Sequence, residues 1–339
     1  MTLSFRRQLL LPLLIALTGF GLASVIDISD LPQHPFYEPF TYTLLAIGLY
    51  GSVYGIQLEE LKNHNRIVIQ AVTVGVLLKT LIIGGILYLA TRQPAAFLLA
   101  LTVAQIDPLA VANLLTGDSS QLSDRARTIL SAWSSFDDPM TVLLSIYALY
   151  FFIPHNGSEN LLGVLSPFFV SLVQNLIFAG LIFWLSRRFK GQNTLLTFLL
   201  VACFVVAVYF KWMLGIALIG LFLRPNIKRL PDLISAAFYI AILLLGFLLV
   251  NGINWLNGLI LALAALLSQV FVGFLLTHGL PRVERFYLAF AQQNGITAMI
   301  LALLFETQLP ETVSLVAPAI LFINLGYYLI NRVLQKGSA

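Results

Sequence analysis

Three carboxylates lie in the middle of strongly apolar stretches of this sequence. Asp107 belongs to one stretch, and Asp137 and Asp138 are adjacent in the next. An aspartate at the centre of a membrane helix costs about 2.5 to 3.5 kcal/mol on insertion scales, so such residues typically mark an ion or proton path. The alternatives are a structural hydrogen bond at a helix junction for Asp138, a pair with Lys79 for Asp137, and a structural cap of the broken helix for Asp107. We predict that all three bind protons or a cation.

A proline follows each acidic position directly, as Pro108 and Pro139. Proline removes one backbone N–H and leaves the carbonyl four residues earlier without its partner, which predicts a broken helix at both places. Freed carbonyl oxygens and carboxylates are hard ligands that suit small cations. Buried carboxylates also bind protons, so protons and a sodium-like ion would compete for Asp137 and Asp138.

The composition is that of a polytopic membrane protein. Of the 339 residues, 59% are hydrophobic and only 10% are charged, and the mean hydropathy is +0.91. This leaves no room for a separate soluble domain. Cys203 is the only cysteine, which excludes a disulfide framework and a thiolate metal site within one chain. We expect no cofactor, and no nucleic acid as partner.

Apolar windows of the length that crosses a bilayer, about 17 to 25 residues, recur along the chain. They predict an all-α fold with about twelve transmembrane helices in one domain, 1–339, with the seventh and eighth helices short. The expected helices are 8–27, 40–58, 66–90, 95–116, 128–152, 162–186, 194–210, 212–224, 233–253, 257–278, 285–305 and 312–334.

The basic residues favour one orientation in the membrane. The chain has 19 Lys and Arg residues. With the N-terminus inside, only Arg92 and Lys211 fall in outside loops, and Lys79 lies within the third helix. This positive-inside bias predicts cytoplasmic N- and C-termini in a bacterial inner membrane, and it supports an even number of helices.

The helix pattern repeats with opposite orientation. Repeat one, 8–152, and repeat two, 212–334, each hold five expected helices, and linker helices at 162–210 separate them. The fourth helix of each repeat is interrupted by polar residues at a similar depth, at 105–108 and 292–295. Paired interruptions in inverted repeats point to a transport site at the midplane.

Polar side chains at mid-span complete the expected site. Lys79 and Gln269 occupy equivalent places on the third helices of the two repeats. We hypothesise that Lys79 forms a salt bridge with Asp137 or Asp107, because an unpaired buried ammonium is costly; a lysine facing a water-filled crevice is the alternative. We expect the central cavity to be lined by Ser134, Gln105, Gln269, Gln292, Gln293 and Asn294.

Several of these stretches resemble the monovalent cation:proton antiporter superfamily. Residues 104–111 resemble its Thr-Asp-Pro helix, 134–139 its Asn-Asp-Pro motif, and 44–61 its Gly-Leu-containing helix. The resemblance implies a core with two crossing unwound helices, a separate dimerisation domain and a required acid at Asp138. Asp137 stands where electroneutral members carry Asn, and an Asp pair there is typical of electrogenic members.

The chain also departs from the pattern of that superfamily. Ile106 stands in place of a threonine, Trp133 in place of a glutamate, and Gln269 in place of a core lysine or arginine. These departures leave the ion and the coupling open, whereas the architecture still fits.

The resulting prediction is a secondary active antiporter and not an enzyme. It would exchange a monovalent cation, sodium first, for protons by alternating access, as an electrogenic homodimer. An intramembrane aspartyl protease also needs two membrane aspartates, but 115–118 fails its Gly-x-Gly-Asp motif. A non-transporting sensor or assembly subunit with the same fold is the remaining alternative.

Overall fold

The computed structural model describes residues 10–26, 30–54, 65–108, 110–111, 123–152, 161–293 and 295–337. The first half of this part contains α2 (Leu11–Ala23), η2 (Leu31–Gln33), α3 (Tyr37–Tyr54), α5 (Asn65–Gln70), η3 (Ala71–Gly75), α6 (Val76–Thr91), α7 (Ala96–Val103) and α9 (Asp124–Phe152). The second half contains α10 (Leu161–Arg188), α11 (Asn193–Phe210), α12 (Met213–Ile219), α13 (Leu230–Leu248), η4 (Leu249–Asn251), α14 (Trp255–Leu276), α15 (Arg282–Ala289), α16 (Ile296–Glu306) and α17 (Thr312–Gly337).

The all-α fold is confirmed over these ranges, because each of the twelve expected windows contains a helix. Six helical stretches are long and apolar enough to cross a membrane by length and composition. The third window includes a five-residue π-helical segment, η3, between α5 and α6, which the sequence pattern does not reveal. The arrangement as two inverted five-helix repeats stays a prediction.

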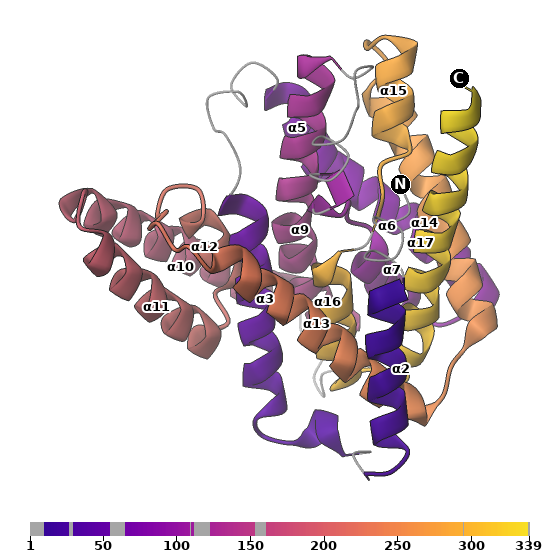
Figure 1. Cartoon of the computed structure of the whole chain (residues 1–339), viewed down its shortest axis with the longest axis horizontal. Helices are drawn as coiled ribbons and strands as arrows, with labels where there is room; N and C mark the ends of the chain where they lie inside the picture. The colour runs from indigo at the N-terminus through magenta and orange to yellow at the C-terminus, as the bar shows by residue number, and fades with distance from the viewer. Residues whose placement is uncertain are drawn as a thin grey trace.

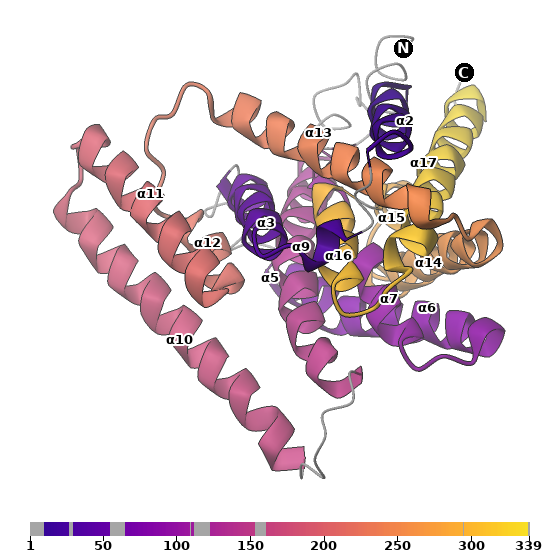
Figure 2. The ribbon, with the colours of Figure 1, turned by 90° about the horizontal axis from the view of Figure 1, so that it is seen from below.

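The helices form a bundle with one outlying pair (Figures 1 and 2). The helices α10 and α11 lie at one side, and both pack against α12. In addition, α10 contacts α9 and α11 contacts α3. Their outer faces expose Val173, Ile177 and Val205, as expected for helices that face lipid. The helices α6, α7 and α14 lie on the other side of the bundle, and α3, α9 and α16 lie between them and the outlying pair.

The helices α2 and α13 pack against each other at unusually short range. A Cβ added to Gly19 would lie 2.3 Å from the carbonyl oxygen of Leu243, and one added to Gly246 would lie 2.2 Å from that of Ala16. The two backbones approach this closely because glycine has no side chain, a packing mode that is common between membrane helices.

The two expected broken helices are present. One break separates the end of α7 at Val103 from a short helical segment at Pro108, and the other separates α15 from α16. At the first break the residues beyond Val111, up to 122, lie outside the described part. The breaks meet in space, because Ile106 and Gln293 pair as an isolated antiparallel bridge.

The break expected at Pro139 is absent, so that prediction was wrong. The helix α9 continues through Pro139 from Asp124 to Phe152. The proline ring removes the N–H that would bond to the Ser135 carbonyl, but the turns before and after it remain helical. The hydroxyl of Thr141 donates to a different carbonyl, that of Asp137, at 2.7 Å. A proline inside a membrane helix can thus be accommodated without ending the helix.

Candidate functional site

The two broken helices fix the position of Asp107. Its backbone N–H donates to the carbonyl of Gln292 at 2.8 Å, which ties one break to the other. A Cβ added at Gly295 would lie 2.8 Å from Asp107 Oδ1, so a residue without a side chain fits there. The Asp107 carboxyl group therefore lies beside the N-terminal end of α16, where the helix dipole favours a negative charge.

Asp137 is held in a buried ion pair. Its Oδ2 atom lies 2.8 Å from Lys79 Nζ, and both side chains are fully buried. The backbone N–H of Ile106, at the first break, donates to the same oxygen at 2.9 Å. The ring of Trp133 also faces the ammonium, with its centroid 5.8 Å from Nζ. Of the two partners expected for Lys79, the structure places Asp137 beside it.

Asp138 lies next to this ion pair but points toward the second broken helix. Its Oδ2 accepts a hydrogen bond of 2.9 Å from the Thr297 hydroxyl in the first turn of α16. Its Oδ1 is buried and has no hydrogen-bond partner among the described residues. The Oδ1 atom of Asp137 is likewise buried and without a hydrogen-bond partner among the described residues, but its Oδ2 atom is paired with an ammonium. Asp138 forms no ion pair within the described residues, and this difference leaves it open to a proton or cation.

A cavity of about 210 Å³ reaches Asp138. It is lined by Asp107, by Ser131, Ser134 and Asp138 of α9, and by residues of α3. The lining residues of α9 run from Asp138 toward the N-terminal end of that helix. The cavity thus approaches the carboxylates from the side of the molecule on which α9 begins, and the predicted lining role of Ser134 agrees with this position.

The predicted amides make other contacts near the crossing. Gln269 Nε2 donates to the Leu288 carbonyl at the end of α15, Gln292 Nε2 donates to Asn324 Oδ1, and Gln105 Nε2 donates to the Thr102 carbonyl, each at 3.1 Å. Gln293 is buried without a hydrogen-bond partner among the described side chains. These four amides do not line the 210 Å³ cavity, and a role for them in transport stays a prediction; Asn294 lies outside the described residues.

The three acids do not converge on one point. Within the described residues, no group of three or more His, Cys, Asp or Glu side chains is placed to hold a metal ion. A cation at Asp138 must therefore take most of its oxygen ligands from hydroxyl groups, backbone carbonyls or water.

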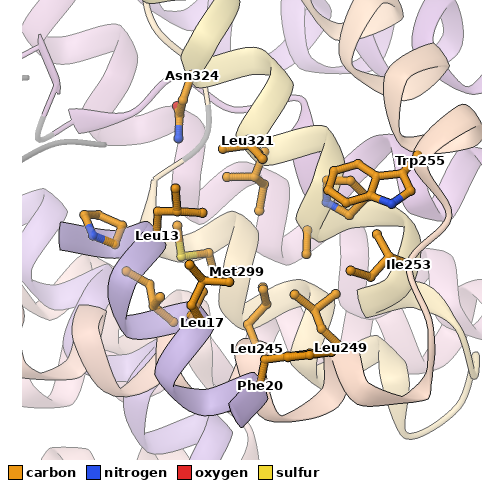
Figure 3. A pocket seen from close by; sticks show the side chains of 16 residues that line it. Leu13, Leu17, Phe20, Leu245, Leu249, Ile253, Trp255, Met299, Leu321 and Asn324 are labelled. Atoms are coloured by element: carbon orange, nitrogen blue, oxygen red, sulfur yellow. The ribbon is translucent and has the colours of Figure 1, made fainter. Parts of the chain in front are cut away.

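A second cavity, of about 240 Å³, lies away from the carboxylates (Figure 3). Leu17 of α2, Leu245 of α13, Met299 of α16 and Leu321 of α17 contribute to its almost wholly apolar wall, and Asn324 lies at one end. An apolar wall of this kind offers no ligands for a cation. It does mark where α2 and α13 face the helices that carry the site.

Comparison with known proteins assigns the family. The profile described as "Sodium/hydrogen exchanger, transmembrane" matches residues 7–335, which is nearly the whole chain. This chain belongs to the sodium/hydrogen exchanger family. A member of this family is an integral membrane transporter that exchanges a cation for protons, and not an enzyme. A search of curated protein sequences gave no match.

The fold of this exchanger is also found among solved structures. The sodium proton antiporter MjNhaP1 from Methanocaldococcus jannaschii, solved at pH 8, superposes with a TM-score of 0.68 at 19% sequence identity. The match covers 93% of this chain and 91% of that chain. At this identity the comparison shows a common fold, which confirms the all-α membrane-protein fold expected from the sequence, whereas the arrangement as two inverted repeats stays a prediction.

Sequence reasoning missed one polar contact of the candidate site around Asp138. Thr297 was not among the expected residues, although its hydroxyl bonds directly to Asp138. The one available signal was its place two residues after Gly295, in the first turn beyond the second break.

Proposed function

We propose that this exchanger moves sodium against protons by alternating access, with Asp138 as the group that binds either ion. The observation that supports this most directly is the buried Asp138 at the meeting point of two broken helices, with one carboxylate oxygen unpaired among the described residues. A buried carboxylate is costly when it is charged and alone, so it favours a state with a bound proton or a bound cation.

The experiment that tests this is a survey of ions. The exchanger is placed in everted vesicles, and a pH-reporting dye follows the response to sodium, lithium, potassium and calcium. We expect proton movement with sodium or lithium. A dimeric, well-folded protein that moves protons with none of these ions would instead support the sensor or assembly subunit.

We also propose that exchange is electrogenic, with the ion pair between Lys79 and Asp137 as the second charge-changing element. Both side chains of this pair are fully buried, and Asp137 is adjacent to Asp138 in the chain. When a cation is bound, Asp137 is released from Lys79, and the ammonium gives up a proton. Reversal of these steps on the other side moves more protons than cations in each cycle.

Asp137→Asn tests this stoichiometry. With the partner acid removed, we expect the variant to carry fewer protons per cation, so that a membrane potential drives exchange less than in the wild type. The measurement is exchange in proteoliposomes under imposed potassium diffusion potentials. The companion variant Lys79→Gln with Asp137→Asn avoids an unpaired ammonium and should show the same loss. Equal potential dependence in wild type and variants would rule out the pair of Lys79 and Asp137 as the carrier of a second proton.

In the proposed orientation both termini are cytoplasmic and the membrane is a bacterial inner membrane. The N-terminal end of α9 then lies on the cytoplasmic side, because Arg125 and Arg127 lie in the first turn of that helix. The 210 Å³ cavity approaches Asp138 from that same side. The described conformation is accordingly the one in which the site communicates with the cytoplasm.

A homodimer is part of the same proposal, with α2, α3, α12 and α13 as the scaffold and α5 to α9 with α14 to α17 as the moving core. We expect Leu14→Cys on α2, whose leucine is 60% exposed, to crosslink between protomers while exchange continues. Ile177→Cys on α10, 65% exposed, is the matched site outside the scaffold and should stay monomeric on denaturing gels. Crosslinking at Ile177 or through α9 contradicts this division.

A further inference from the structure

Thr297 is an unusual threonine for this chain. Thr18, Thr43, Thr73, Thr80 and Thr91 all donate to a carbonyl four residues earlier in their own helix, as hydroxyl groups in apolar surroundings normally do. The Thr297 hydroxyl instead crosses to another helix and donates to Asp138 Oδ2 at 2.9 Å. The Thr297 side chain is fully buried, so this hydrogen bond lies in the interior of the protein.

The acid that Thr297 contacts has few charged neighbours to share a cation with. Asp137 is paired with Lys79 and accepts from the Ile106 N–H, and no cluster of three acids is placed to hold a metal among the described residues. The cavity at Asp138 offers other oxygen groups, on Asp107, Ser131 and Ser134. Among the described residues, however, the hydroxyl group that hydrogen-bonds to Asp138 is that of Thr297 on α16.

Hydroxyl chemistry suits this place because one oxygen serves two partners. A threonine hydroxyl has one O–H donor and two acceptor lone pairs. It can keep donating to Asp138 Oδ2 while a lone pair faces a cation that is bound to the same carboxylate. Hard monovalent and divalent cations favour such oxygen ligands.

We propose that Thr297 Oγ1 is a ligand of the transported cation, so that α16 contributes directly to ion selection. This rests on the proposed exchange at Asp138. The ion is then held between α9 and α16. The break before α16 is itself tied to the first break, because the Asp107 N–H donates to the Gln292 carbonyl. An ion bound to the Thr297 hydroxyl would therefore contact a helix that is linked to both breaks.

The test compares Thr297→Val, which keeps the shape but loses the hydroxyl, with Thr297→Ser, which keeps it. Apparent affinities for lithium, sodium and potassium are measured on purified protein by cation-dependent thermal stabilisation at fixed pH. We expect the valine variant to bind its best ion about tenfold more weakly, the effect of losing one bond to a charged group, and the serine variant to restore most of this. Thr297→Ala replaces the valine variant if that one fails to fold.

The ratio between ions separates a ligand from a positioning residue. Loss of a ligand changes the preference among lithium, sodium and potassium, whereas loss of a bond that only orients Asp138 weakens all three alike. Thr41→Val is the matched control, because Thr41 is equally buried but bonds within α3. Unchanged ion ratios in the valine variant, or a change as large in Thr41→Val, would overturn the proposal.

Asp138→Asn in the same binding assay keeps this outcome distinct from a failure of the proposed function. If Asp138→Asn loses cation binding while Thr297→Val keeps wild-type affinity and ion ratios, only the assignment of Thr297 is wrong. If Asp138→Asn still binds cations as the wild type does, the exchange site is elsewhere, and both proposals are overturned.

Discussion

Asp138→Asn is expected to reduce exchange to below about a tenth of the wild-type rate, a loss of more than 1.4 kcal/mol in the limiting step. The amide can neither take up and release a proton nor carry the negative charge that balances a cation. Its Oδ1 still accepts the bond from Thr297, so the helix crossing remains intact. Exchange is measured in reconstituted vesicles at equal protein density.

The matched control for this variant is Asp124→Asn. Asp124 lies in the first turn of the same helix, α9, but it is exposed and outside the crossing. We expect wild-type exchange from it, because a solvated carboxylate far from the site contributes little to ion binding. A rate above about a tenth of wild type in Asp138→Asn, at normal expression and size-exclusion behaviour, would show that Asp138 is dispensable.

Lys79→Gln is expected to have the largest effect on stability. Removal of one partner from a buried ion pair costs about 3 to 5 kcal/mol, because the other charge stays buried and alone. Lys79 and Asp137 are both fully buried, and Asp137 keeps only the Ile106 N–H as a donor in the variant. Thermal unfolding of the purified protein, followed by fluorescence-detected size exclusion, measures the loss.

The stability loss of Lys79→Gln should depend on pH in a defined direction. A carboxyl group that has lost its ammonium partner is tolerated when it holds a proton and is costly when it is ionised. The stability deficit of Lys79→Gln should therefore be small at acidic pH and grow as the pH rises. The pH profile of exchange should move to higher pH in parallel, since the acid must still lose its proton to bind a cation.

Two double variants identify the source of the effect. Lys79→Gln with Asp137→Asn removes both charges and should be more stable than Lys79→Gln alone, because no charge remains unpaired. Lys79→Gln with Gln269→Lys returns a cation to the equivalent helix of the other repeat and should restore part of the stability and of the pH profile. Wild-type stability and pH dependence in Lys79→Gln would mean that Lys79 faces a water-filled crevice.

The sequence located the broken helices correctly because the signal there is local. Pro108 and the polar run from Gln292 interrupt windows that are otherwise apolar, and no apolar packing compensates for the lost backbone bonds in lipid. The same reasoning failed at Pro139, because α9 continues through that residue. Local patterns do not show whether the packing around a proline allows the helix to continue.

Contacts between distant residues needed the structure. The sequence left Lys79 with either Asp137 or Asp107 as partner, because the rotation of α6 against α9 decides between them. Thr297 carried almost no signal, since one threonine in an apolar helix is usually bonded to its own backbone. Its hydrogen bond to Asp138 depends on the angle at which α16 meets α9. No spacing of residues along the chain encodes that angle.

The glycine contact between α2 and α13 has a consequence for how the molecule can work. Where backbones touch through Gly19 and Gly246, no side chains are available to exchange neighbours, and even a small shift drives a carbonyl into the opposite helix. This contact cannot serve as a slip plane. In the proposed alternating-access cycle, sliding is then expected where α13 meets α16 and α17 along the apolar cavity, with α2 and α13 moving together as one unit.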